Sequence, residues 1–186
     1  GLKPYLKKLE KICKKNNILL IFDEVQVGIG RTGKIYCHEH FDIKPDIFTL
    51  AKAIGGGLPV GAVVASPKVA DFLTPGSHGT TMGGNPLAMA AGMASFKQIN
   101  TKSFLGSVTS KGNYFLKELK KLSRNNNIKE VRGLGLILAI EFFSSKLAKK
   151  FATSCLNKGL LVLLTEKVNI RILPPLNVKK SEIDQS

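Results

Sequence analysis

Lys52 is the residue whose type and setting most directly suggest chemistry. It follows a short apolar run, Ile47 to Leu50, and precedes the triplet Gly55-Gly56-Gly57. A cation at the end of a buried strand is costly unless it is paired or chemically used, and an amine held out of water can become a nucleophile that forms a Schiff base. The alternative is a lysine that extends from a loop into water, which the abundance of lysine favours. The glycines favour the chemical role, because they let a ligand approach the backbone.

Asp23 and Glu24 follow a second apolar run, Ile18 to Phe22. Such a run is typical of a strand buried on both faces of a parallel sheet, so the acids are expected at its carboxyl end, where open α/β sheets bind ligands. A carboxylate fixed there could hold the proton on the ring nitrogen of pyridoxal phosphate, which is an electron sink only while that nitrogen is protonated. A metal ligand or an ordinary surface carboxylate is also compatible with this position.

Thr80 and Thr81 supply two hydroxyls in a glycine-lined loop, His78 to Gly84, directly before Asn85-Pro86. Hydroxyl and backbone donors just ahead of a helix are suited to binding a phosphate. A helix cap has much the same composition, so the loop alone does not decide between the two.

The elements that must position these residues alternate along the first half of the chain. The spacing of apolar residues predicts a helix over 3–16, and the Asn85-Pro86 pair predicts the start of another. Strands are expected over 18–22, 47–50 and 61–65, with a glycine-rich loop over 27–34. Helices alternating with short apolar strands indicate an α/β fold.

The second half follows a different order. A long helix is expected from about Asn100 to Ser123, and then strand, strand, helix, strand and strand over 130–132, 134–142, 145–157, 160–164 and 169–173. This order describes a small α+β unit, so we place a boundary near residue 102, with 1–102 in one domain and 103–186 in another. The start at Gly1, and a capping pattern at Ser181 that promises a helix without supplying one, suggest that both ends are cut.

The net charge of +15 first suggests a nucleic-acid partner. The basic residues are mostly lysines at spacings that fit solvated helix faces, without interleaved aromatic side chains on which bases could stack. We therefore expect no nucleic-acid partner. No apolar run is long enough for a membrane span and no signal peptide is recognisable, so we expect no membrane partner and a cytoplasmic location.

Two other groups of residues could be mistaken for sites. Cys37-His38-Glu39-His40 has metal-ligating types, but adjacent side chains point apart, so no metal is expected. The glycines of 28–33 resemble a dinucleotide loop, yet Arg31 and the lack of a following helix argue against one. The three cysteines are widely scattered, which favours reduced thiols over a disulfide framework.

Three motifs together resemble the class-III aminotransferases: Leu19 to Lys34, Lys44 to Gly57, and His78 to Ala88. They occur in the family's order, and the same interval separates Asp23 from Lys52 and Lys52 from Thr81. The resemblance continues through Arg132-Gly-Leu-Gly135 and Arg171-Ile-Leu-Pro-Pro175, and so covers nearly the whole chain. Within the class, the motifs are most similar to those of acetylornithine aminotransferases, with ornithine aminotransferases close behind.

The resemblance implies pyridoxal 5'-phosphate as cofactor and a role for each matching residue. Lys52 corresponds to the lysine that forms a Schiff base with the cofactor and later moves a proton at the substrate Cα. The motif Asp23-Glu24-Val25-Gln26 corresponds to the cofactor-binding turn, in which Asp23 pairs with the ring nitrogen and Gln26 lies beside the phenolic oxygen.

The remaining roles concern the substrate and the subunit partner. The resemblance implies that Thr81 reaches the cofactor phosphate of a second subunit in a homodimer with shared sites, and that Thr80 lies near the substrate. Arg171 corresponds to the arginine that receives the substrate α-carboxylate, a bidentate task for which lysine is poorly suited. Without the resemblance, Arg171 would be interpreted as a surface arginine on an edge strand.

The implied fold is the type I pyridoxal-phosphate transferase fold, here as part of the large α/β domain followed by the small C-terminal α+β domain. The implied reaction transfers an amino group from N-acetylornithine to 2-oxoglutarate, in arginine biosynthesis. Ornithine or 4-aminobutyrate as amino donor, and an inactive remnant or one half of a split enzyme, are the alternatives. The family's phosphate loop, ring-stacking aromatic residue and second substrate arginine are expected upstream of Gly1.

Overall fold

The computed structural model describes residues 2–124 and 126–186, which form two compact units. Unit 1 consists of the chain up to Gly30 together with Lys34–Phe104, and unit 2 of Arg31–Gly33 together with Leu105–Ser186. The division into family domains at residue 102 stays a prediction. Within the described ranges, no helix combines the length and the apolar character that crossing a membrane requires.

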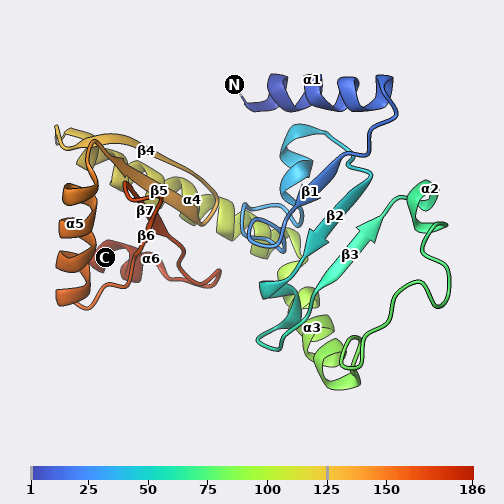
Figure 1. Ribbon diagram of the computed structural model, residues 1–186. Helices are drawn as coiled ribbons and strands as arrows, with labels where there is room; N and C mark the ends of the chain where they lie inside the picture. Colours follow the sequence, from blue (N-terminus) through green and yellow to red (C-terminus); the bar gives the residue numbers. More distant parts are fainter. Residues whose placement is uncertain (1, 125) are drawn as a thin grey trace. The chain divides into compact units, whose positions relative to one another are not determined.

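Unit 1 contains a three-stranded sheet in the order β1-β2-β3 (Figure 1). Strands β1 (Ile21–Asp23) and β2 (Ile47–Leu50) are parallel, whereas β3 (Ala62–Ala65) runs antiparallel to β2. Because β1 and β2 are parallel, both reach their carboxyl ends at the same edge of the sheet. The second strand coincides with the predicted range 47–50.

The helices of unit 1 are α1 (Leu2–Lys15), α2 (Pro67–Ala70) and α3 (Pro86–Ile99), with short 3-10 helices η1 (Cys37–Phe41) and η2 (Lys52–Gly55). The predicted start of α3 is confirmed, since the Asn85 side chain accepts a hydrogen bond from Ala88 N at 2.9 Å. One apolar cluster of unit 1 joins α1 to the segments on either side of β1; it comprises Cys13, Leu20 and Ile43, with Leu6, Leu9, Phe22 and Phe41 against them.

Unit 2 is built on a four-stranded antiparallel sheet in the order β4-β5-β7-β6 (Figure 1). Its strands are β4 (Ile128–Leu134), β5 (Ile137–Phe142), β6 (Leu163–Thr165) and β7 (Asn169–Ile172). Its helices are α5 (Ser145–Asn157), α6 (Lys180–Gln185) and most of α4 (Lys102–Lys121), which η3 (Leu122–Arg124) follows. The small α+β pattern expected of the second half, including the helix over 145–157, is confirmed.

The alternation of side chains divides the sheet of unit 2 into two faces. On one face Leu138, Ile140 and Ile170 are at most 1% exposed. The other face carries Arg132 on β4, Glu141 on β5, and Asn169 and Arg171 on β7. One face therefore supplies the core, and the other supplies polar groups.

Two predictions about the chain near β1 and α6 are wrong. The run 18–22 is not a strand buried on both faces: β1 begins only at Ile21, lies at an edge of its sheet, and leaves the Ile21 side chain 57% exposed. The pattern at Ser181 does supply a helix, α6, whose first turn is closed by Glu182 accepting a hydrogen bond from Lys179 N at 2.6 Å.

The strand boundaries of unit 2 also differ from the prediction. The strand expected over 134–142 is interrupted by a tight turn, in which Gly135 has a φ of 56°, so Leu134 ends β4 and β5 begins at Ile137. The first strand of the last predicted pair also begins later than expected, since β6 comprises Leu163–Thr165 and not 160–164.

Candidate active site

Asp23 and Lys52 lie at the carboxyl ends of two adjacent parallel strands. Asp23, the last residue of β1, is paired in register with Thr49 of β2. Lys52 begins the 3-10 helix η2, which closely follows the end of β2 at Leu50. Both side chains are exposed at this edge. This is the edge at which open α/β sheets bind ligands, and the chain brings the two predicted residues to it together.

The Asp23 carboxylate is held by one of its two oxygens. Its Oδ1 accepts a hydrogen bond from Val25 N at 2.9 Å and lies 3.5 Å from the hydroxyl of Thr49. Among the residues that the structure describes, Oδ2 has no hydrogen-bond partner. The carboxylate is therefore fixed in place while it keeps one acceptor available for a ligand.

Lys52 has a backbone conformation that is unusual for its residue type. Its φ of 52° lies in the left-handed region, which costs a non-glycine residue about 1 kcal/mol or more. Within the described ranges, its amine has neither an ion pair nor a hydrogen bond. Strain at a residue whose polar group is unused is typical of functional sites.

Two glycines let the turn that carries Lys52 pack closely on α3. A Cβ at Gly92 would lie 2.7 Å from the carbonyl oxygen of Ile54, and a Cβ at Gly56 would lie 2.7 Å from the carbonyl oxygen of Ala91. Gly56 also has a φ of 59°. Part of the glycine triplet thus serves helix packing, whereas a Cβ at Gly57 would meet no atom within 4 Å.

Glu24 faces away from the Asp23 carboxylate. It is 2% exposed, and its carboxylate accepts hydrogen bonds from the backbone N–H groups of Cys37 and His38 at 2.6 and 2.8 Å. The His38 Nδ1 lies 2.7 Å from the same carboxylate. Burial, with the charges of Glu39 and Glu24, raises the pKa of Tyr36 in the same segment. Glu24 thus ties the predicted cofactor turn to η1, and Gln26 is half-buried in that turn.

His38 is a residue whose connection to this turn the sequence did not suggest. The sequence drew attention to Cys37-His38-Glu39-His40 only as possible metal ligands. Among the described residues, no group of histidine, cysteine and acidic side chains could hold a metal ion. The signal that could have located His38 was the need of a buried carboxylate for donors, but no sequence pattern identifies which residue supplies them.

Thr80 and Thr81 lie in a loop whose residues 71–84 are all exposed. The Thr80 hydroxyl accepts a hydrogen bond from Gly83 N at 3.1 Å, which closes a tight turn directly before the Asn85 cap. These contacts fit a helix cap as well as a phosphate-binding loop, so the phosphate-binding role of Thr80 and Thr81 stays a prediction.

Arg171 lies in unit 2, on the polar face of the sheet. It lines a cavity of about 370 Å³ together with Arg132, Glu166 and Asn169. Arg132 donates to Asn169 Oδ1 at 2.9 Å, and Asn169 donates to Glu166 at 3.1 Å. The segment that precedes Arg171 on β7 is therefore fixed by a chain of polar contacts.

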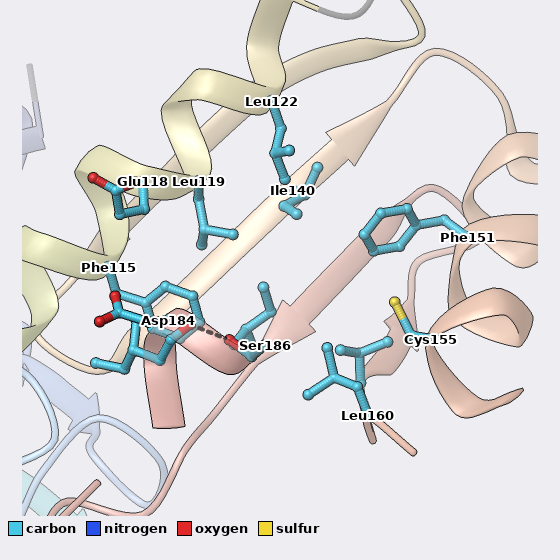
Figure 2. A pocket seen from close by; sticks show the side chains of 13 residues that line it. Phe115, Glu118, Leu119, Leu122, Ile140, Phe151, Cys155, Leu160, Asp184 and Ser186 are labelled. Carbon is cyan, nitrogen blue, oxygen red and sulfur yellow. Dashed lines mark hydrogen bonds between the residues drawn. The ribbon is translucent and has the colours of Figure 1, made fainter. Parts of the chain in front are cut away.

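A second cavity of unit 2, of about 290 Å³, lies on the apolar face (Figure 2). Its wall is formed by side chains such as Leu119, Ile140, Phe151 and Leu160, with Glu118 and Asp184 beside them. None of the predicted site residues lines it. We therefore place the candidate chemistry elsewhere, at the sheet edge of unit 1.

The donor set at that edge fits pyridoxal phosphate. The cofactor needs an amine that can form a Schiff base and a carboxylate that holds the proton of the ring nitrogen. Lys52 supplies an amine with no partner among the described residues, and Asp23 supplies a fixed carboxylate with an available oxygen. The residues present are thus of the required types, on neighbouring strand ends.

Comparison with known proteins agrees with this chemistry. The family "Aminotransferase class-III" matches residues 2–186. The chain is 48% identical to acetylornithine aminotransferase of Methanocaldococcus jannaschii, over 98% of this chain and 46% of that protein. It is 46% identical to the mitochondrial acetylornithine aminotransferase of Alnus glutinosa, over 99% of this chain and 41% of that protein. The chain thus spans about half the length of the curated relatives it matches.

Solved structures give the same result for the fold. Acetylornithine aminotransferase from Elizabethkingia anophelis superposes with a TM-score of 0.89 at 39% identity, covering 97% of this chain and 46% of that one. Ornithine delta-aminotransferase of Plasmodium falciparum superposes with a TM-score of 0.90 at 37% identity, covering 98% of this chain and 48% of that one. The predicted fold, part of a type I pyridoxal-phosphate transferase, is confirmed. The chain belongs to the class-III aminotransferases, a family whose cofactor is pyridoxal phosphate.

Proposed function

We propose that the chain carries the lysine part of the active site of an aminotransferase that moves an amino group from N-acetylornithine to 2-oxoglutarate, in arginine biosynthesis. One observation carries the proposal: Asp23 and Lys52 lie exposed at the carboxyl ends of adjacent parallel strands, each with an unused polar group in the described part of the chain. The names of the curated relatives support N-acetylornithine as the amino donor.

Each predicted residue has a definite task in this proposal. When bound, pyridoxal phosphate supplies the electron sink that stabilises negative charge at the substrate Cα. Lys52 holds the cofactor and moves the proton at that carbon, and Asp23 keeps the ring nitrogen protonated. Gln26 lies beside the phenolic oxygen, and Val25 fixes Asp23 through its backbone N–H. Glu24 supports the turn from its buried side.

The substrate and the partner subunit involve three further residues. Arg171 receives the α-carboxylate of the amino acid or the 2-oxo acid, since its planar guanidinium can bind a carboxylate with two parallel hydrogen bonds. Thr80 lies near the substrate, and Thr81 binds the cofactor phosphate of a second subunit. The exposure of the whole loop 71–84 supports a homodimer in which this loop meets another chain. A cytoplasmic location is part of the same proposal.

A second candidate function is transamination of ornithine or 4-aminobutyrate. The similarity to the ornithine aminotransferase of Plasmodium falciparum, with a TM-score of 0.90, favours ornithine as the specific alternative. A third candidate is a non-catalytic remnant, or one half of an enzyme that assembles with a separate N-terminal chain. The exposure of both Asp23 and Lys52 is the observation that favours it.

Visible absorbance distinguishes these possibilities. Addition of pyridoxal phosphate is expected to give the band of a lysine-bound cofactor, either with the chain alone or after an N-terminal half of a relative is added. A band that appears only with the added half selects the split enzyme, and no band in either case contradicts the proposal. A panel of N-acetylornithine, ornithine and 4-aminobutyrate then identifies the amino donor.

Replacement of the lysine tests the mechanism in any active assembly. Lys52→Ala is expected to reduce turnover by at least about 10³-fold, because no other residue takes over the covalent and proton-transfer roles. The matched control is Lys68→Ala, which removes an exposed lysine of α2 and is expected to leave turnover unchanged. Turnover that survives Lys52→Ala would count decisively against the mechanism.

A further inference from the structure

Glu24 uses all of its polar groups to hold the segment that follows Asp23. Its backbone N–H donates to Thr49 O at 3.0 Å, and its carbonyl oxygen accepts from Gly28 N at 2.9 Å. Its carboxylate meets the N–H groups of Cys37 and His38 and the His38 ring. The residue next to Asp23 is thus tied to β2, to the turn and to η1 at once.

The His38 ring is the donor that completes this arrangement. An ionised carboxylate only accepts hydrogen bonds, so we assign the ring proton to Nδ1, which lies 2.7 Å from Glu24. The ring is stacked on Tyr36, with 5.6 Å between centroids and 4° between planes, and it contacts Phe48 at 5.1 Å. Its side chain is only 12% exposed. The hydrogen bond is therefore largely shielded from competing water.

The side chains around Asp23 point to two different faces of the sheet. Successive side chains of a strand point to opposite faces, so Phe22 and Glu24 face the His38 ring, whereas Asp23 faces the other side. The His38 ring also contacts Phe22 edge-on, at 6.4 Å between centroids. The residues before and after Asp23 are thus both held by contacts with His38.

We propose that His38 is a positioning residue, which acts through the buried Glu24 to keep the Asp23 carboxylate in place. Without the Nδ1 donor, the buried charge of Glu24 lacks one of its three donors, and that is costly enough to loosen the turn. Asp23 then loses the backbone frame in which Val25 N holds its Oδ1. The inference rests on the proposed function only for the cofactor ring nitrogen that Asp23 would bind. The coupling of His38 to Asp23 through Glu24 is expected in the protein without cofactor as well.

Amide hydrogen exchange in the full chain, without cofactor, tests the coupling. The Val25 N–H reports directly on the Asp23 carboxylate, and the Cys37 and His38 N–H groups report on Glu24. His38→Phe keeps an aromatic ring but removes the donor, and we expect the Val25 amide to exchange about tenfold faster, as loss of a hydrogen bond to a charged group implies. His38→Asn keeps a donor near the position of Nδ1, and we expect exchange within about threefold of the parent chain.

A packing control separates this role from general stability. Tyr36→Leu removes the stacked ring but leaves the His38 donor, so global stability is expected to fall while local opening at Val25 stays unchanged. If His38→Phe does not fold, His38→Gln replaces it, because its amide reaches the position of Nε2 instead of Nδ1. Faster exchange at Val25 in the Gln variant but not in the Asn variant then supports the proposal.

Two results would overturn the inference. In the first, His38→Phe accelerates exchange at Cys37 and His38 but leaves Val25 protected, so that the pair holds η1 alone. In the second, exchange at every amide increases by the same factor, so that the ring merely stabilises the unit. Failure of the parent chain to bind pyridoxal phosphate would contradict the proposed function and would leave these exchange results intact.

Discussion

The two units of the chain differ in how completely they bury their apolar side chains. In unit 2, Val108, Leu136 and Ile140 have no exposed surface. In unit 1, Val63 of β3 is 65% exposed and Leu87 of α3 is 72% exposed. Unit 2 therefore holds most of the buried apolar side chains among the described residues, whereas unit 1 exposes more apolar side chains, as surfaces that meet another protein surface do.

This difference matters for function because the candidate chemistry is in the less buried unit. Asp23, Lys52, Thr80 and Thr81 are all exposed residues of unit 1, and Arg171 belongs to unit 2. Side chains that must bind a cofactor have to remain accessible, so they cannot supply a core. Arg171 lies instead on the polar face of the sheet of unit 2, and the buried apolar side chains of the opposite face stabilise that sheet.

The largest expected effect comes from comparing a buried side chain of unit 2 with an exposed side chain of unit 1. Ile140→Ala removes a fully buried side chain from β5 and is expected to cost unit 2 about 2 to 5 kcal/mol. Val63→Ala removes an exposed side chain from β3 and is expected to change the stability of unit 1 by at most about 0.5 kcal/mol. Hydrogen exchange of the slowest amides in β5 and β2 measures both free energies of unfolding.

A large effect of Val63→Ala would break the comparison. It would mean that the surface of β3 is buried in solution, as it would be if two chains associate. The loss should then depend on protein concentration, which analytical ultracentrifugation of the same samples would detect.

The elements were predicted well where one local signal dominates. The limits of β2 and α5 agree with the sequence because apolar runs and helical spacing mark them clearly. The prediction for β1 was wrong because an apolar run does not reveal whether the strand lies at the centre or at the edge of its sheet. The β4–β5 turn was misplaced because its position depends on the left-handed conformation of Gly135, which composition does not fix.

The candidate site was predictable in part for a similar reason. A lysine and an acid at the ends of short apolar runs could be recognised, and the parallel pairing of β1 with β2 brings them to one edge. His38 could not be found, because its partner Glu24 is distant in sequence and the contact depends on how η1 folds back. The roles of Gln26, Thr80, Thr81 and Arg171 stay predictions.

The next effect tests how tightly unit 2 is packed. Gly112 of α4 faces the β4–β5 turn, where a Cβ would lie 2.2 Å from the carbonyl oxygen of Gly135. Gly112→Ala is therefore expected to destabilise unit 2 by about 1 to 3 kcal/mol. Gly106→Ala is the matched control on the same helix, where a Cβ meets nothing within 4 Å, and it is expected to stabilise by up to about 1 kcal/mol. Urea denaturation measures both, and equal effects would contradict the close packing.

A smaller effect concerns α3 in unit 1, which few buried side chains support. Asn85→Ala removes the side chain that accepts from Ala88 N and is expected to cost about 1 kcal/mol. Asn113→Ala, at an exposed interior position of α4, is the control and is expected to stabilise slightly, because alanine has the higher helix propensity. Exchange of the amides in the first turn of α3 measures the change, and no acceleration there would show that the cap does not hold this helix.

The smallest expected effect concerns the attachment of α6 to α4 within unit 2. The hydrogen bond that the Tyr114 hydroxyl donates to the Asp184 carboxylate holds the proton on the phenol and, with the negative charge of Asp184, raises the pKa of Tyr114 to about 12. Because the folded pKa lies above the unfolded value of about 10, this contact stabilises the protein below pH ~10, and the contribution is lost as the pH rises toward 12. Asp184→Asn is expected to lower the pKa of Tyr114, followed by ultraviolet absorbance of the phenolate, whereas Asp71→Asn, an exposed control, is not. Identical titrations of the parent and Asp184→Asn chains would mean that α6 is detached from α4 in solution. The packed core of unit 2 would then include the elements up to β7 but not α6.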